Sequence, residues 1–437
     1  MQKHKPSLKD IEKNLIYNSS YKDLKDYYDL VLNKDKSSYK TSNDEPTPIG
    51  CIEEMLSKLP QELWSRKDLE ILDPCCGNGN FHLVGFDKLV KSGRPANEII
   101  EQILYFNDIN EDRISNVKSV FGENINLTRK DFLSFDNSKK YDLVYANPPF
   151  AKFTSEGKRA SKNHTLTRDF LSKSLQLLKP NGYLIYIVPD NWMSLADRNL
   201  LIKEITEYRF HHLDIHTAKK WFPKVGSSFT WMVVQKAKAV GDYTVRCKFS
   251  KREWIGSASN ETRNFIPLLW NREVQSIFAK TIEADNKKFN VETTSDLHKY
   301  TKKELISNIE DAEHKYRLIH TPKQTVWAKR PHKYQEGYKC FISTTDKYKT
   351  FVDDCGMTQS IAFVRCNDEN SAKNIKQTLD HDLYRFLNNL CRWGNFNNIR
   401  ILQKFPIPSN PKDVYHSFNI TKKEIEFIEF VLNDKGV

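Results

Sequence analysis

One four-residue segment constrains the fold more than any other: Asn147, Pro148, Pro149 and Phe150 directly follow the largely apolar run 141–146. Such a run predicts a strand that is buried on both faces of a parallel sheet. The two prolines fix φ and remove two N–H donors, so a rigid corner forms where the strand ends. The Asn147 side-chain oxygen and the Pro148 carbonyl can accept both hydrogens of one amino group, and Phe150 offers a face for a flat ring. The corner therefore suits a planar group that carries an exocyclic NH2, such as adenine.

A glycine turn lies upstream of this corner. The short apolar run 69–72 predicts a strand, and Asp73 follows at its tip, ahead of Gly77 and Gly79. Glycine has no Cβ, so the backbone can turn sharply and approach a ligand closely. An acid at a strand tip with a glycine turn suits a nucleoside with a charged tail. The turn lacks the Lys-Ser/Thr ending of a phosphate loop, and its Asp favours a cation. A methionine-derived α-amino group therefore fits better than a phosphate.

Two further acids follow predicted strands. Asp108 ends the run 103–107, and Asp131 precedes the aromatic Phe132. Strands and helices that alternate in this way predict an α/β fold with a doubly wound parallel sheet. Asp and Asn are also common turn residues, so an ordinary structural role is the alternative for each acid.

Together these residues resemble the S-adenosylmethionine-dependent amino-methyltransferases of DNA. The closest resemblance is to the N6-adenine class of restriction–modification type, with cofactor motifs first, then the catalytic motif, then the target-recognition region (the gamma-type order). The Asn-Pro-Pro-aromatic catalytic motif of the family is present as Asn147–Phe150. Its pattern Asp-Pro-x-Cys-Gly-x-Gly-x-Phe is present as Asp73, Pro74, Cys76, Gly77, Gly79 and Phe81. The resemblance covers roughly residues 40–240, and 241–437 only weakly.

The resemblance implies S-adenosyl-L-methionine as the cofactor and gives each acid a role. Asp73 would hold the methionine amino group. Asp108 would bond the ribose hydroxyls, with Ile109 against the cofactor adenine. Asp131 would accept from the 6-amino group of that adenine, and Phe132 would pack against its ring.

Two further motifs of the family have counterparts here. Thr47 and Pro48 look like the pair that closes over the cofactor. Phe222, in a Phe-Pro-x-x-Val context, looks like the aromatic residue that stacks on an extruded base. The resemblance thus implies a flipped adenine held between Phe150 and Phe222, with its amino group bound at Asn147. Catalysis would rest on positioning and dipole orientation, without a strong general base. For Phe222, a role in the core is the alternative.

The charge balance favours a polyanionic partner. The formal net charge is +12, and basic stretches lie within 151–180 and 321–350. Charge alone supports non-specific binding and does not define a fold. Ordinary solvated surface is the alternative for any single basic residue. The candidate contacts to double-stranded DNA are Lys158, Arg159, Lys162 and Arg330.

We expect three parts: an N-terminal helical extension (1–40), a Rossmann-like methyltransferase domain (41–240) and a mixed α/β target-recognition domain (241–437). The eight cysteines include no CxxC pair or metal spacing, so we expect free thiols and no metal. We expect no signal peptide and no membrane span, and a cytoplasmic, DNA-associated protein of a prokaryote or phage. No nuclease constellation is convincing. A cognate endonuclease would therefore be encoded elsewhere, and the enzyme would be a monomer or weak dimer.

Two other interpretations remain open. The same corner occurs in methyltransferases of RNA base amino groups and of protein glutamine amides. The basic, aromatic-rich C-terminal half favours nucleic acid over a protein amide, and the Phe222 context favours a flipped base in DNA. A non-catalytic DNA-binding module with a degenerate cofactor fold is the second alternative, against which the intact motifs argue. The DNA recognition sequence cannot be read from the chain.

Overall fold

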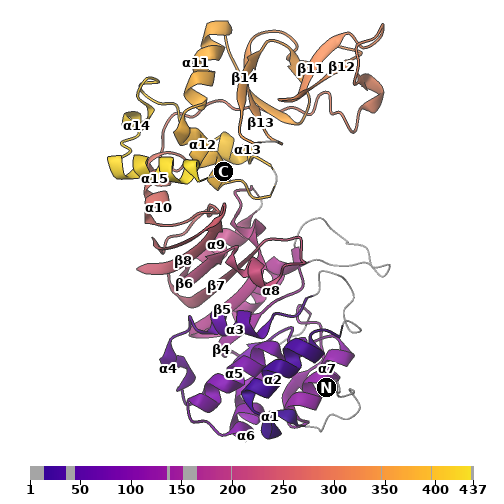
Figure 1. The fold of residues 1–437 in the computed structure, drawn as a ribbon, viewed down its shortest axis with the longest axis vertical. Coiled ribbons are helices and arrows are strands. Elements are labelled where there is room, and N and C mark those ends of the chain that lie inside the picture. Colours follow the sequence, from indigo (N-terminus) through magenta and orange to yellow (C-terminus); the bar gives the residue numbers. More distant parts are fainter. Residues whose placement is uncertain are drawn as a thin grey trace, which may run out of the picture. The chain divides into compact units, whose positions relative to one another are not determined.

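The computed structural model describes residues 14–35, 45–134, 138–150, 165–197, 199–345, 347–394 and 396–434 (Figure 1). The chain forms two compact units. The first comprises Met1–Trp192, Leu200–Arg246 and Ser259–Arg263. The second comprises Met193–Asn199, Cys247–Ala258 and Asn264–Val437. The assignment of residues 241–437 to target recognition stays a prediction.

A nine-stranded sheet has the order β3-β2-β1-β4-β5-β7-β6-β8-β9, and the change of unit falls within its last two strands. Its five strands from β3 to β5 pair in parallel, as predicted for a doubly wound sheet. Strand β7 then runs antiparallel to both β5 and β6. The strands are β1 Ile71–Asp73, β2 Leu104–Asn107, β3 Asn126–Thr128, β4 Tyr141–Ala146, β5 Leu178–Pro189, β6 Tyr208–Ile215, β7 Phe229–Lys238, β8 Asp242–Phe249 and β9 Arg252–Ser259.

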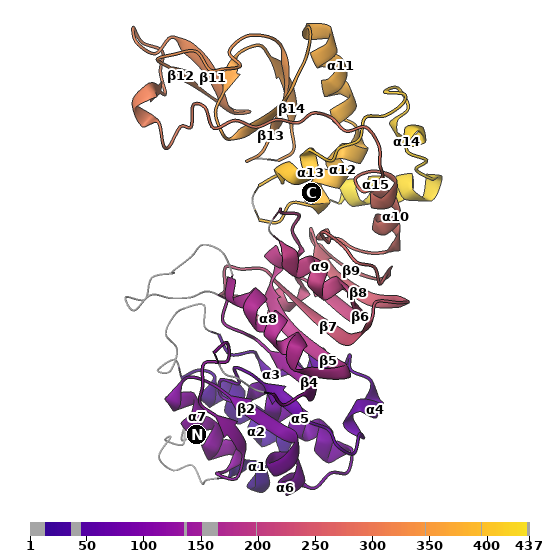
Figure 2. The same ribbon diagram turned by 180° about the vertical axis from the view of Figure 1, so that it is seen from behind.

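Helices cover both faces of the parallel part of the sheet. Helices α3 and α5 lie on one face (Figure 1), and α8 lies on the other (Figure 2). This follows from right-handed crossovers, because the chain moves in opposite directions from β1 to β2 and from β4 to β5. The helices of this unit are α1 Leu15–Asn18, α2 Tyr21–Tyr27, α3 Ile49–Leu56, α4 Gln61–Trp64, α5 Asn80–Lys91, α6 Ala96–Glu98, α7 Glu111–Phe121, α8 Thr165–Leu177 and α9 Leu200–Thr206. Shorter or irregular helical turns are η1 Tyr28–Leu32, η2 Ile99–Ile103, η3 Asp190–Met193 and η4 Thr217–Trp221.

Strand β4 is buried along its whole length, as its apolar run predicts. Its Tyr145 ring stacks on Phe81 of α5, with ring centroids 5.1 Å apart. The Tyr145 hydroxyl also lies 2.7 Å from Nδ1 of His82. These contacts fix β4 against the first turn of α5. The turn that begins α5 and the corner that ends β4 are thereby held in a set relation.

The second unit contains two small sheets and several helices. One sheet has the order β10-β12-β11-β15 and the other has the order β14-β13-β16. Helix α11 packs against β13 and β14. The strands are β10 Ile306–Ser307, β11 Tyr316–Thr321, β12 Gln324–Ala328, β13 Lys339–Ser343, β14 Thr350–Asp353, β15 Gly356–Met357 and β16 Ile361–Arg365. The helices are α10 Arg272–Lys280, η5 Lys303–Leu305, α11 Glu369–Leu379, α12 Asp382–Leu390, α13 Ile399–Leu402, α14 Val414–Ser417 and α15 Lys422–Asn433.

The described residues bear on two expectations, the absence of a membrane span and the absence of a metal site. No helix in them combines the length and the apolar character that a membrane span requires. No group of three or more His, Cys, Asp or Glu side chains among the described residues is placed to hold a metal ion.

Candidate active site

An open pocket lies against the carboxyl ends of β1 and β4, and its volume, counted together with the solvent space at its mouth, is about 400 Å³. Ligands of open α/β sheets bind in this position, outside the carboxyl ends of the strands. The pocket brings the glycine turn, the Thr47 segment and the corner after β4 to one place. Its lining residues are Glu45, Pro46, Thr47, Asp73, Cys75, Cys76, Gly77, Asn78, Asn80, Phe81, Arg113 and Asn147.

Asp73 is a buried acid at the end of β1, only 1% exposed. Burial raises the pKa of its carboxyl well above the usual range, and the charge of Asp108 raises it further. The Cys75 amide donates to Asp73 Oδ1 at 3.2 Å and opposes this shift. A buried carboxylate is stabilised when a cation or further donors reach it. The pocket therefore favours a positively charged ligand group near Asp73.

Asp108 follows β2 and braces the glycine turn. Its Oδ2 accepts from the Gly77 amide at 2.9 Å, and its Oδ1 accepts from the Asn110 amide at 2.8 Å. Asn110 is in turn the N-cap of α7, where its side chain accepts from the Asp112 and Arg113 amides. The carboxylate thus joins the turn to the start of α7. It does not line the pocket, so its predicted bond to a ribose stays a prediction.

The other residues assigned to the cofactor adenine also stand apart from the pocket lining. Ile109 is 64% exposed. Asp131 is exposed and accepts from the Leu133 amide at 3.0 Å, within a turn. Phe132 is buried against Phe170 of α8, with ring centroids 5.2 Å apart. Their roles toward an adenine ring remain predictions.

The corner after β4 is held by two contacts. Asn147 Nδ2 donates to the Glu45 carbonyl at 3.4 Å. The Cys75 thiol donates to the Asn147 carbonyl at 3.7 Å. Pro148 is buried and Pro149 is exposed. The corner is therefore tied both to the Thr47 segment and to the glycine turn.

Three phenylalanine rings lead from the corner into the core of this unit. Phe150 is half-buried, and its ring centroid lies 5.8 Å from that of Phe229, at the start of β7. Phe229 also contacts Phe222, at 5.0 Å between centroids. Phe222 is only 5% exposed and belongs to the core of this unit. The sequence did not single out Phe229, which contacts both predicted stacking residues.

The other residues predicted to bind the cofactor have structural roles in and around the glycine turn. Thr47 is buried, and its carbonyl accepts from Asn80 Nδ2 at 2.8 Å. Pro48 is the N-cap of α3. The Pro74 carbonyl accepts from Asn107 Nδ2 at 2.9 Å, and Gly79 is the N-cap of α5.

Six lining residues were not among the predicted site residues: Glu45, Pro46, Cys75, Asn78, Asn80 and Arg113. Asn78 and Asn80 are polar residues between and after the two glycines, and their position there was an available signal. Arg113 lies one turn into α7, the helix that follows Asp108. The N-terminal helices also reach this region, because the Tyr28 hydroxyl donates to the Asn78 carbonyl at 2.8 Å.

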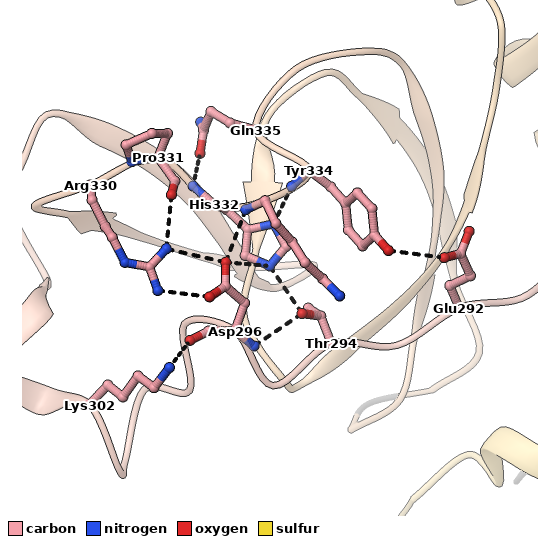
Figure 3. Close-up of polar contacts among 10 residues, drawn as sticks. Glu292, Thr294, Asp296, Lys302, Arg330, Pro331, His332, Tyr334 and Gln335 are labelled. Atoms are coloured by element: carbon pink, nitrogen blue, oxygen red, sulfur yellow. Dashed lines mark hydrogen bonds and ion pairs between the residues drawn. The ribbon is translucent and has the colours of Figure 1, made fainter.

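The candidate DNA contacts fall into two groups. Lys158, Arg159 and Lys162 lie outside the described residues. Arg330, in the second unit, forms an ion pair with Asp296 at 2.7 Å between Nη2 and Oδ1 (Figure 3). The same guanidinium donates to the Pro331 carbonyl at 3.1 Å. Arg330 therefore has partners within the protein, and base reading by its side chain stays a prediction.

The Arg330 ion pair belongs to a larger polar network (Figure 3). Asp296 Oδ2 accepts from the Lys333 amide at 2.9 Å, and the Arg330 hydrogen bond lowers the pKa of this carboxyl to about 2. His332 Nδ1 accepts from the Tyr334 amide at 3.0 Å, and Nε2 lies 3.1 Å from the Thr294 hydroxyl. The Nδ1 lone pair is thus engaged, which fixes the tautomer with hydrogen on Nε2. Burial lowers the pKa of this imidazole to about 4.

Comparison with known proteins finds similar sequences for part of the first unit. Residues 63–222 match the family model described as Eco57I restriction-modification methylase. The type II methyltransferase M.VspI of Vibrio sp. (strain 343) is 29% identical over 190 residues, covering 40% of this chain and 43% of that protein. An uncharacterized adenine-specific methylase of Mycoplasma pneumoniae is 26% identical over 159 residues, covering 33% and 35%. The matches span less than half the length of either relative.

The solved structure of a DrdV–DNA complex shares the fold more widely. It aligns with a TM-score of 0.50 and 10% identity, over 94% of this chain and 59% of that one.

The fold and the family match agree: the chain carries a doubly wound α/β domain, and the part of it that matches a family model is similar to methyltransferases. Within this domain, residues 63–222 are similar to methylases of the Eco57I restriction–modification type.

Proposed function

We propose that this protein transfers a methyl group from S-adenosyl-L-methionine to the N6 amino group of an adenine flipped out of double-stranded DNA. The carrying observation is that one pocket is lined both by the buried acid Asp73 and by Asn147. A cation-binding residue and an acceptor for a substrate amino group are thus side by side.

The residues around Asp73 fit this cofactor. Its methionine end carries an ammonium group, and its sulfonium is also positive. A buried carboxyl with a raised pKa, beside backbone that turns at two glycines, suits such a ligand. When bound, the cofactor supplies an electrophilic methyl group.

Asn147 would orient the target amino group. Its Nδ2 is directed to the Glu45 carbonyl, which can only accept. With Nδ2 engaged in this way, Oδ1 and the Pro148 carbonyl would accept the two amino hydrogens of the substrate. Both bonds draw the nitrogen lone pair out of the ring and aim it at the methyl group. Positioning and fixed dipoles then supply most of the rate enhancement.

The base must leave the stack to reach this corner. Phe150, which is half-buried against Phe229, offers a ring face beside Asn147. Phe222 also packs against Phe229, and its ring would be the second aromatic side chain beside the flipped base. The proton on the methylated nitrogen can leave to solvent after transfer, so no base is required.

We further propose that residues 241–437 recognise the DNA target, with Lys158, Arg159, Lys162 and Arg330 among the contacts. The net charge of +12 supports a polyanionic partner. Such an enzyme would act beside DNA in a prokaryotic or phage-infected cytoplasm, with any cognate endonuclease on another chain. We expect the enzyme to be a monomer or a weak dimer.

The test is Asn147→Ala, assayed on duplex DNA, on RNA and on a glutamine-containing peptide. Loss of a contact that strengthens in the transition state costs about 3 kcal/mol, so N6-methyladenine on DNA should fall more than about a hundredfold by mass spectrometry. Cofactor affinity, measured by calorimetry, should stay near that of the wild type. The surface variant Asn374→Ala on α11 is the matched control. Methylation of the RNA or peptide alone, or near-wild-type activity of Asn147→Ala on DNA, would refute the proposal.

A further inference from the structure

Asn80 is a buried polar residue of the same pocket. It is the first residue of α5, directly after Gly79, and is only 4% exposed. Its side chain lines the pocket together with Asp73. A polar group buried in this way normally satisfies every hydrogen-bonding atom, so its partners are informative.

The partners of Asn80 fix which way its amide points. Nδ2 donates to the Thr47 carbonyl at 2.8 Å and to Asn33 Oδ1 at 3.1 Å. The Thr47 carbonyl can only accept, so the nitrogen of Asn80 must face it. Both hydrogens of Nδ2 are therefore used, and the amide cannot flip without losing them.

The oxygen of this amide remains without a partner. Asn80 Oδ1 is buried and has no hydrogen-bond partner among the described residues. The amide nitrogen is anchored on two segments of the chain: one contains Thr47, and the other contains Asn33, which directly follows η1. The anchored side chain therefore holds one fixed acceptor within a residue that lines the pocket.

We propose that Asn80 Oδ1 accepts a hydrogen from the α-ammonium group of S-adenosyl-L-methionine, sharing that group with the Asp73 carboxylate. This inference rests on the proposed function. An ammonium group has three N–H donors that point in different directions, so the Asp73 carboxylate alone cannot accept all of them. Asn80 is a second residue of the pocket lining that carries an acceptor. The carboxylate of the cofactor is itself an acceptor and would be repelled there. Asn80 is thus a further cofactor-binding residue, and its anchor couples the Thr47 segment to the bound amino acid.

This contact is tested by removing the acceptor from the protein and, separately, the donor from the ligand. S-adenosylhomocysteine and its analogue without the α-amino group are titrated by calorimetry into the wild type and into Asn80→Ala. A hydrogen bond to a charged group accounts for roughly tenfold to a hundredfold in affinity. S-adenosylhomocysteine should lose about this factor in the variant. The analogue should bind both proteins equally, because the partner of Oδ1 is already missing.

Two more variants separate contact from packing. Asn80→Leu keeps the number and branching of the side-chain heavy atoms and should show the same selective loss as Asn80→Ala. Asn33→Ala removes one anchor but keeps Oδ1, so it should weaken S-adenosylhomocysteine less than Asn80→Ala does. Thermal unfolding is followed for each variant.

Three outcomes are decisive. An equal loss for both ligands would overturn the proposal and assign Asn80 to packing or to a hydroxyl of the ribose. Unchanged affinity for S-adenosylhomocysteine would overturn it outright, while leaving the proposed methyl transfer intact. If the wild type binds neither ligand, the proposed function itself fails, and this inference fails with it.

Discussion

Substituting alanine at Gly77 and at Gly79 should have opposite consequences, although both glycines belong to one turn. Both have positive φ, 55° at Gly77 and 86° at Gly79. Their surroundings differ. A Cβ on Gly79 would stand 2.8 Å from Cε2 of the buried Phe121 ring, whereas a Cβ on Gly77 would have no described atom within 4 Å. Gly77 lines the pocket, and Gly79 does not.

The magnitudes follow from these surroundings. A left-handed conformation costs an alanine about 1 kcal/mol, and this applies to both variants. Overlap with Phe121 adds about 1–3 kcal/mol at Gly79, because a packed aromatic core yields only partly. In a unit of this size about 1 kcal/mol lowers Tm by roughly 2–4 °C. We therefore expect Tm to fall by roughly 3 °C for Gly77→Ala and by roughly 6–12 °C for Gly79→Ala.

Cofactor binding should show the reverse order. The new methyl group of Gly77→Ala occupies the pocket itself, so calorimetry should show the larger loss of S-adenosyl-L-methionine affinity for this variant. Differential scanning calorimetry on the same samples gives Tm. Equal Tm losses, or a larger affinity loss at Gly79, would refute the geometry assigned to the turn.

Three further outcomes are expected. Asp108→Ala should weaken S-adenosyl-L-methionine binding by roughly 2 kcal/mol in a calorimetric titration, since it removes a charged acceptor and frees the Gly77 amide; unchanged affinity would contradict this. Phe222→Ala should lower the unfolding free energy by about 3 kcal/mol, because the ring is buried against Phe229. With 2-aminopurine at the target adenine, its DNA complex should also fluoresce more brightly than wild type, and equal brightness would leave Phe222 a packing residue. For His332, burial lowers the pKa from 6.5 to about 4, so its neutral ring contributes stability above pH 6.5 that is lost as pH falls toward 4. His332→Gln should flatten that fall by up to about 3 kcal/mol in urea unfolding, and parallel curves would contradict the shift.

The sequence predicted the parts of the fold that depend on local pattern. The run before Asn147 gave a fully buried strand, and the alternation of elements gave the parallel order around it. These succeed because a strand buried on both faces needs a continuous apolar run. The insertion of β7 between β5 and β6 could not be predicted, since strand order depends on pairings that periodicity does not encode.

The sequence predicted the site residues that lie at strand ends and missed those that depend on side-chain contacts between distant segments. Asp73 and Asn147 stand at strand ends, and parallel strands bring their carboxyl ends to one edge, so their meeting in one pocket follows from topology. Phe229 contacts Phe150, and Asn80 contacts Asn33 and Thr47, and these partners are distant in sequence. The ribose contact of Asp108 stays a prediction, and the structure adds that its carboxylate accepts from two backbone amides. Such bracing depends on side-chain geometry, which no motif specifies.

The span between Glu45 and Asn147 also bears on how the chain folds. Their contact joins residues 102 positions apart, and the Phe150 contact adds β7 later still. Contacts between distant residues form late, because loop-closure entropy opposes them until the intervening structure is in place. A nascent chain on the ribosome therefore cannot close this pocket before β4 has emerged. Ligand binding to the growing chain would then mark the completion of the sheet, and a bound ligand would stabilise the finished unit against reopening.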